Sequence, residues 1–228
     1  MGQINSISIL STSQEFGNDK RDLSGFHPIG GIFIPLFLLV FMLHAPVALI
    51  WLEIIPFEYR FHLFFCFLAG IVFYCSFRRY GLHELGFRTD NLRSSLGWNM
   101  LFCAVGAMGL YMTYKAGFLR SRDQNFLPYV YIFYIFFLGP VQEVFFRGIL
   151  FAEMKRAQIL DNRWILLIST LSFCFLHLIY RRPPLLLMAL ISGLIWGIIF
   201  TKWPNIWGIA LSHSLLGALA IFLGVIWT

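Results

Sequence analysis

Charged residues are scarce in this sequence. They make up 12% of its 228 residues, whereas an ordinary soluble domain has about 25%. Hydrophobic residues make up 59%, and the mean hydropathy is +0.75. This composition argues against a soluble globular domain and favours a polytopic membrane protein, in which the hydrophobic spans leave no room for a soluble catalytic domain.

Cysteine pairs and zinc-binding spacings are also missing. The four cysteines all lie inside apolar stretches: Cys66, Cys75, Cys103 and Cys174. None of them forms a Cys-x-x-Cys pair, and the chain has no His-Glu-x-x-His motif. We therefore interpret the cysteines as small hydrophobic residues, and expect neither a disulfide framework nor a structural zinc site.

Long apolar runs account for most of the chain. A polar tail, residues 1–26, precedes a single transmembrane domain, residues 27–228. Within it we expect spans near 29–52, 61–77, 96–114, 127–151, 164–180, 184–201 and 205–227, each close to the roughly 20 residues that a bilayer requires. The fold class predicted is all-α, a transmembrane bundle of about seven spans. The amphipathic, basic segment 78–95 is expected at the membrane interface.

The positive charges lie in the loops between these runs. Because Lys and Arg of this kind orient membrane helices, the net charge of +6 does not indicate a nucleic-acid partner. The loops on the side of the N-terminal tail hold ten Lys and Arg, against six on the other side. This excess predicts an integral, multi-pass membrane protein with a cytoplasmic N-terminus.

Ionisable residues inside the fourth span are the most informative feature. A charge in the hydrocarbon region costs several kcal/mol, so such a group is by default a functional candidate. Glu143 and Arg147 are four residues apart, share a helix face and are expected to pair. Gln142 precedes them, and Gly139-Pro140 is expected to bend or loosen the helix nearby.

Two histidines lie inside later spans, His177 in the fifth and His213 in the last. Counting 1.5 Å per residue from one side places Glu143 and His213 at a similar depth, with His177 about 9 Å deeper, a gap that a late or broken start of the fifth helix would close. A single buried histidine is usually structural, and a lone Glu–Arg pair often only packs helices. Four such groups at one level instead predict a buried polar site that opens to one face of the membrane.

The order of three motifs resembles the CAAX protease and bacteriocin-processing family of intramembrane proteases. The motifs are Gln142-Glu143-Val144-Phe145-Phe146-Arg147, Phe173-x-x-x-His177, and His213 with Gly217 four residues later. The resemblance covers roughly 80–226 and is strongest over 139–217. It implies an intramembrane endopeptidase that cleaves a membrane-anchored peptide or protein, such as a C-terminal sorting or processing segment, in a lipid bilayer. The small size is typical of a bacterial or archaeal cytoplasmic-membrane member.

The resemblance also implies roles for the residues of these motifs. The first glutamate of the family pattern works with His177 to activate water, Glu143 supports the site by pairing with Arg147, and His213 faces the oxyanion. It implies no obligatory cofactor. Two histidines and a glutamate nevertheless leave zinc open.

Two positions depart from the family pattern. Gln142 replaces the first glutamate, and a glutamine holds a water but does not accept its proton. Gly217 stands where the family has an Asn or Asp that helps to stabilise the oxyanion. Three interpretations stay open: a variant that uses Glu143 after a small helix rotation, a natural pseudoenzyme that serves as a membrane scaffold or immunity protein, and an engineered replacement at 142.

Overall fold

The computed structural model describes residues 29–120, 128–159 and 161–225. Within these ranges the chain forms helices joined by loops and has no strand, which confirms the all-α prediction. The predicted polar tail, residues 1–26, lies outside the described residues.

Seven apolar helical stretches follow the predicted spans closely. Six are long and apolar enough to cross a membrane: Phe33–Trp51, Phe57–Arg78, Leu92–Lys115, Pro128–Arg156, Asn162–Tyr180 and Pro183–Lys202. The seventh, Ile206–Phe222, is apolar but shorter. The prediction of about seven spans is confirmed, with most boundaries shifted by a few residues.

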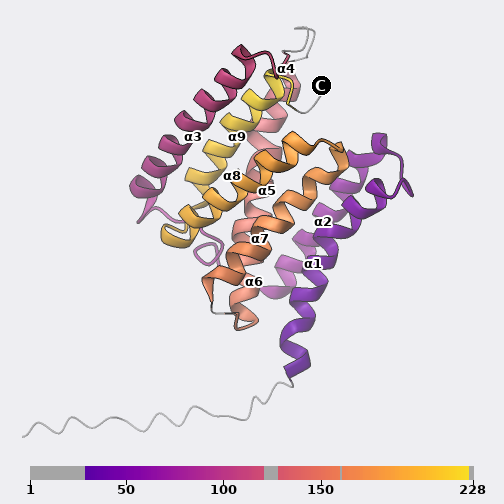
Figure 1. The fold of residues 1–228 in the computed structure, drawn as a ribbon. Helices are drawn as coiled ribbons and strands as arrows, with labels where there is room; N and C mark the ends of the chain where they lie inside the picture. Colours follow the sequence, from indigo (N-terminus) through magenta and orange to yellow (C-terminus); the bar gives the residue numbers. More distant parts are fainter. Residues whose placement is uncertain (1–28, 121–127, 160, 226–228) are drawn as a thin grey trace, which may run out of the picture.

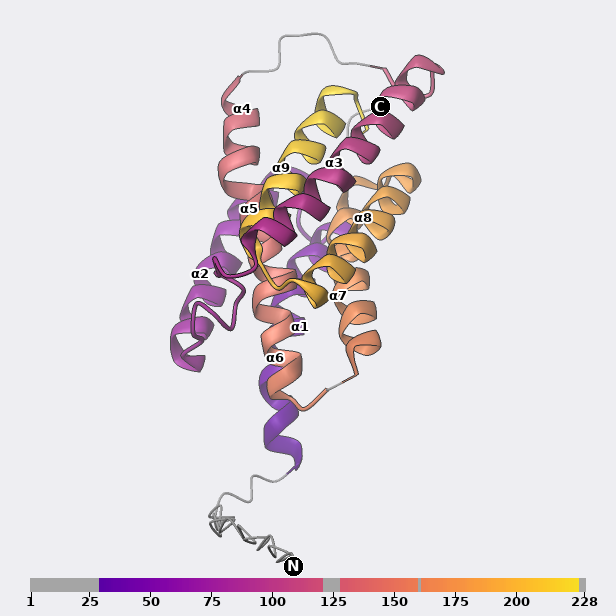
Figure 2. The ribbon, with the colours of Figure 1, turned by 90° about the vertical axis from the view of Figure 1, so that its left-hand side faces the viewer.

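The helices pack around one central column (Figure 1). The elements are α1 (Ile29–Trp51), η1 (Phe57–Tyr59), α2 (Arg60–Arg78), α3 (Leu92–Lys115), α4 (Pro128–Phe133), η2 (Tyr134–Leu138), α5 (Gly139–Glu143), η3 (Val144–Ile149), α6 (Leu150–Arg156), α7 (Asn162–Leu176), η4 (His177–Tyr180), α8 (Pro183–Lys202) and α9 (Ile206–Phe222). The run from α4 to α6 is the column. α1 and α2 lie on one side of it, and α3 and α9 pack side by side on the other, as Figure 2 also shows.

The central column is not a regular α-helix. The short α5 is flanked by two π-helical segments, η2 and η3. At the first of them the Gly139 N–H donates to the Tyr134 carbonyl, five residues earlier. The helix is thus loosened next to Gly139-Pro140, as expected, and π-helical turns of this kind are frequent at functional sites.

The segment expected at the interface, 78–95, is not one element. Arg78 ends α2, a loop of turns follows, and α3 begins at Leu92. The loop packs beneath the start of α9, where the Ile206 N–H donates to the Gly86 carbonyl at 2.9 Å. Asn205 Nδ2 likewise donates to the Arg88 carbonyl at 2.7 Å. These bonds attach the loop to the helix that carries His213.

Polar and charged side chains join α2 and the loop after it to α6, at the end of the bundle where α1 begins. Arg78 Nη2 lies 2.6 Å from Glu153 Oε1, and the Tyr80 hydroxyl donates to the same carboxylate, which is fully buried. Arg156 Nε lies 2.6 Å from Glu84 Oε1. Burial and hydrogen bonding to Glu153 raise the pKa of the Tyr80 hydroxyl far above its ordinary value.

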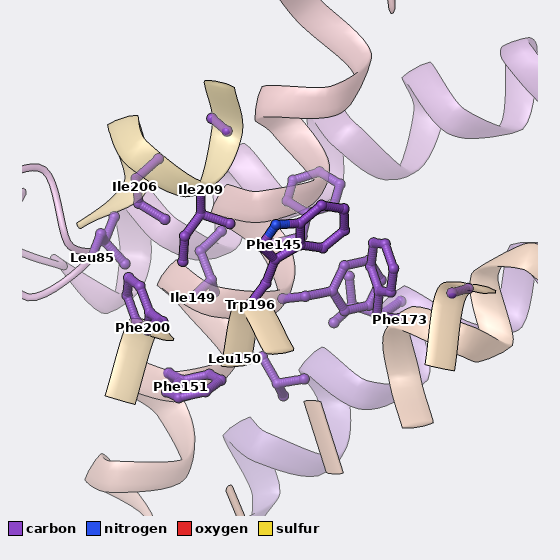
Figure 3. Packing of buried hydrophobic residues seen from close by; sticks show 14 of the residues in the cluster. Leu85, Phe145, Ile149, Leu150, Phe151, Phe173, Trp196, Phe200, Ile206 and Ile209 are labelled. Carbon is purple, nitrogen blue, oxygen red and sulfur yellow. The ribbon is translucent and has the colours of Figure 1, made fainter. Parts of the chain in front are cut away.

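Buried apolar side chains fill the space between the column and its neighbours (Figure 3). Phe173 of α7 and Trp196 of α8 lie edge to face, with ring centroids 5.9 Å apart. Phe146 packs against Phe173 in the same way, at 5.6 Å. This aromatic cluster forms one wall around the polar groups of the central helix.

Candidate functional site

Glu143 and Arg147 form the predicted ion pair at the centre of the bundle. Both side chains are fully buried, and Arg147 Nη1 lies 3.0 Å from Glu143 Oε2. Arg147 Nη2 also donates to the Gly193 carbonyl at 3.0 Å, and its guanidinium carbon lies 4.5 Å from the Phe173 ring centroid. A Cβ on Gly193 would lie 3.1 Å from Phe173 Cδ1. The bare backbone at this position therefore makes room for the Phe173 ring on which the guanidinium lies, whereas Arg147 Nη2 would be at an ordinary contact distance of 3.6 Å.

His213 completes the polar centre from α9. Its Nδ1 donates to Glu143 Oε1 at 2.5 Å. The imidazole is almost fully buried and stacks on Trp196, with centroids 4.6 Å apart and an interplanar angle of 27°. Because the carboxylate holds Nδ1, the ring nitrogen left to act elsewhere is Nε2.

Ser212, the neighbour of His213, belongs to a different network. Its hydroxyl lies 3.1 Å from Asn99 Oδ1 and accepts from Trp196 Nε1 at 2.8 Å. Asn99 Nδ2 in turn donates to the Ser95 carbonyl at 2.8 Å. These bonds fasten α9 to α3 and α8, and leave Ser212 without a bond to His213.

His177 lies where α7 passes into the short 3₁₀ turn η4. Its Nδ1 donates to the Phe173 carbonyl at 2.9 Å, which leaves Nε2 unbonded. The Phe173 ring lies between the two imidazoles, 4.9 Å from His177 and 5.4 Å from His213. Both histidines line one cavity, so the depth difference obtained by counting residues does not separate them.

Gln142 faces a different direction from Glu143. It is 8% exposed and lines a cavity that His177 also lines. Its Oε1 is buried and has no hydrogen-bond partner among the described residues. Adjacent residues of an α-helix point about 100° apart. Glu143 could reach the position of Gln142 only by giving up Arg147 and His213.

Two cavities have some of the predicted site residues in their walls. One, of about 180 Å³, lies between the central column, α1, α2 and the end of α7. The other, of about 350 Å³, lies between α3, α7, α8 and α9. Tyr134 and His177 line both, Gln142 lines the first, and His213 and Gly217 line the second. Gln142, His177 and His213 thus line these two adjoining cavities, which together are called the hollow below, whereas Glu143 and Arg147 line neither.

The cavities lie toward the end of the bundle that is farther from the start of α1. The first is lined by Ile50 near the end of α1, Arg60 at the start of α2, and Tyr180 at the end of η4. The second reaches Thr113 near the end of α3 and Leu185 near the start of α8. Both cavities are therefore lined mainly by residues from the half of the bundle that is farther from the start of α1.

Sequence reasoning missed Tyr134 and Trp196. Tyr134 is eight residues before Gln142, a spacing that places two residues on different faces of a regular α-helix. The π-helical turn η2 accommodates one additional residue. Tyr134 and Gln142 are therefore oriented as if they were seven residues apart on an α-helix, and both side chains line one cavity. Trp196 lies three residues after Gly193, close to it on the surface of α8. Because the Gly193 carbonyl accepts from Arg147, this part of α8 faces the site.

No group of three or more His, Cys, Asp or Glu side chains within the described ranges is placed to hold a metal ion. His177 and His213 are both engaged through Nδ1, to a backbone carbonyl and a carboxylate respectively.

A family of known proteins matches part of the chain. The match covers residues 123–219, and the family is described as type II CAAX prenyl endopeptidase Rce1-like. This segment contains all five residues of the predicted site: Gln142, Glu143, Arg147, His177 and His213. Searches among curated proteins and among solved structures found no match.

Proposed function

Through residues 123–219 the chain belongs to the CAAX protease family, and from this premise we propose that it is an intramembrane endopeptidase. The substrate we propose is a membrane-associated peptide, or a C-terminal sorting or processing segment, cleaved by attack of water. One observation carries the proposal: His213, which is bonded to Glu143 of the Glu143–Arg147 pair, lines one cavity with His177, and His177 lines a second cavity with Gln142. A buried carboxylate, a guanidinium and two imidazoles close to one another are groups that peptide hydrolysis uses.

The water-activating residue in this chain would be His177. Its Nδ1–H is committed to the Phe173 carbonyl, so Nε2 is the nitrogen able to take a proton. The Gln142 amide would hold the water without accepting its proton. The water oxygen bonds to the scissile carbonyl carbon, its proton passes to His177 Nε2, and the C–N bond then breaks as that proton is delivered to the leaving amine nitrogen.

His213 would stabilise the charge that develops on the carbonyl oxygen. Glu143 fixes the orientation of its ring through Nδ1, and protonated His213 has a second N–H at Nε2 to donate to the oxyanion. Arg147 holds the carboxylate in place from the opposite side. In this assignment Glu143 and Arg147 are positioning residues, whereas His177 and His213 touch the reacting atoms.

The chemistry of the first cavity supports a lipid-like or apolar substrate. Apart from Arg60, Gln142, His177 and two tyrosines, its lining consists of apolar side chains. A peptide with a hydrophobic attachment, held in the bilayer beside its cleavage site, would place that attachment here.

A second function is favoured by one specific observation, the glutamine at position 142. Without a carboxylate there, the chain would keep the family fold and bind membrane peptides without cleaving them, as a scaffold or immunity protein. Gln142 Oε1 has no bonding partner among the described residues. The adjacent carboxylate, Glu143, is bonded to Arg147 and His213 instead.

The experiment that tests the proposal compares the full chain with Gln142→Glu in detergent micelles. The probes are internally quenched peptides, one with an S-farnesyl cysteine near its C-terminus and one with a hydrophobic C-terminal tail. Cleavage by both proteins, lost in His177→Ala, supports the protease assignment. Cleavage by the Glu variant alone supports the inactive scaffold for this chain. No cleavage by either folded protein contradicts a protease site.

The side from which substrate reaches the site needs its own measurement. Cysteines introduced at Arg88 and Arg182 lie at opposite ends of the bundle, in the loops before α3 and α8. Labelling intact cells with a membrane-impermeant maleimide, in a chain whose four native cysteines are replaced by alanine, identifies the outer end. The charge count predicts a cytoplasmic N-terminus, so that the cysteine at 182 lies outside the cell and is labelled. Labelling at 88 would mean that the end of the bundle nearer the cavities faces the cytoplasm.

A further inference from the structure

Tyr134 presents an unused hydroxyl to the hollow. The residue lines both cavities, and its ring lies edge to face with His213, with centroids 6.2 Å apart. Its hydroxyl has no hydrogen-bond partner within the described part of the chain, in contrast to the hydroxyls of Tyr74, bonded to the Pro35 carbonyl, and Tyr80, bonded to Glu153. A phenol placed among apolar side chains normally finds a partner, so an unbonded one at a cavity wall points to a ligand.

The same phenol occupies the space that a side chain at position 217 would need. A Cβ built on Gly217 would overlap the hydroxyl and the adjoining ring carbons of Tyr134. Glycine is therefore the residue that allows the phenol to reach this point. Position 217 is one helical turn after His213, so the hydroxyl lies on the same side of α9 as the imidazole.

We propose that Tyr134 is a catalytic residue whose hydroxyl donates a hydrogen bond to the oxyanion. In this role it replaces the donor that a polar side chain at position 217 would supply. The proposal rests on the protease function proposed above. When water adds to the scissile carbonyl, its oxygen gains negative charge, and Tyr134 O–H and protonated His213 Nε2–H donate to it. The phenol keeps its proton, and the hydrogen bonds weaken when the C–N bond breaks and the carbonyl re-forms.

The π-helical segment η2 is what delivers the phenol to this position. Tyr134 is its first residue, and Ser214 Oγ donates to the Ile135 carbonyl at 2.8 Å, which ties the segment to α9. Gly139 packs against the same serine, where a Cβ would lie 2.7 Å from Ser214 Oγ. The donor is thus held on a rigid element beside His213, as preorganised oxyanion stabilisation requires.

The test uses the full chain. The background is either the unchanged chain or Gln142→Glu, whichever of the two cleaves the quenched peptides faster. Tyr134→Phe removes only the hydroxyl and is expected to lower kcat about 10²-fold with little change in KM, since the lost bond forms in the transition state. A merely structural phenol would leave kcat within about twofold, and that result overturns the proposal.

A compensating pair separates loss of the donor from loss of packing. Tyr134→Ala alone is expected to lose at least as much turnover as Tyr134→Phe. Adding Gly217→Asn places an amide donor in the vacated space and is expected to restore about 10-fold of kcat. The matched control, Tyr134→Ala with Gly217→Leu, fills the space without a donor and should restore none. Equal recovery by Asn and Leu would contradict the proposal.

Failure of the protease function itself has a different signature. If neither the unchanged chain nor Gln142→Glu cleaves any probe while both stay folded, the function is wrong and the role of Tyr134 is overturned with it. If cleavage occurs and Tyr134→Phe is unaffected, only the assignment of Tyr134 is wrong.

Discussion

Glu143 Oε1 accepts a hydrogen bond from His213 Nδ1 at 2.5 Å, across 70 positions of sequence. The same carboxylate pairs with Arg147 one turn away. Glu143 therefore has two partners inside the bundle, Arg147 and His213. In the proposed function these contacts make Glu143 the residue that orients His213, and His177 the residue that transfers the proton.

Replacing Glu143 by glutamine should destabilise the protein strongly. Glu143→Gln keeps the shape of the side chain but leaves the fully buried Arg147 without a counter-charge. Removing one partner of a buried ion pair typically costs about 3 to 5 kcal/mol. We expect a loss of about 3 kcal/mol in the free energy of unfolding, measured by denaturant titration in micelles.

The matched control for this substitution is Glu58→Gln. Glu58 is exposed in the turn before α2 and has no ion pair with any described residue. Its replacement should change the free energy of unfolding by less than about 0.5 kcal/mol. Similar effects at the two positions would show that the Glu143–Arg147 pair adds nothing to stability.

Gly208 is expected to set the distance between α3 and α9. A Cβ at this position would lie 2.5 Å from Ser95 Oγ and 3.2 Å from the Ser95 carbonyl carbon. Gly208→Ala should therefore push the two helices apart and cost about 1 to 3 kcal/mol. The resulting shift of α9 should also lower peptidase activity, because α9 carries His213.

A second glycine of the same helix pair provides the control. Gly97 is exposed on α3, and a Cβ there meets nothing within 4 Å. Gly97→Ala should stabilise the helix by about 0.5 to 1 kcal/mol, because alanine loses less backbone entropy. A destabilised Gly97→Ala, or a Gly208→Ala that unfolds at the same temperature as the unchanged chain, would contradict this account of the interface.

The sequence predicted the spans well because each is a nearly unbroken apolar run bounded by polar residues. It also predicted the Glu143–Arg147 pair, since a four-residue spacing on a helix is local. It did not predict the position of Tyr134, because the π-helical turn η2 changes which residues share a face. Counting residues separated His177 from His213 by about 9 Å in depth, although both line one cavity in the structure, because such a count does not include where each helix lies in the bundle.

The contact between Arg156 and Glu84 predicts how stability depends on pH. Hydrogen bonds from Arg156 hold the pKa of Glu84 below its ordinary value of 4.5. A carboxyl whose pKa is lower in the folded protein stabilises it above the unfolded pKa, and this stabilisation disappears as the pH falls through the folded value. The unchanged chain should therefore lose stability between about pH 5 and pH 3. Glu84→Gln should lose less over this interval, whereas Glu58→Gln should behave like the unchanged chain. Melting temperatures in micelles at several pH values measure the difference, and parallel curves for Glu84→Gln and the unchanged chain would show that the Arg156 contact does not persist in solution.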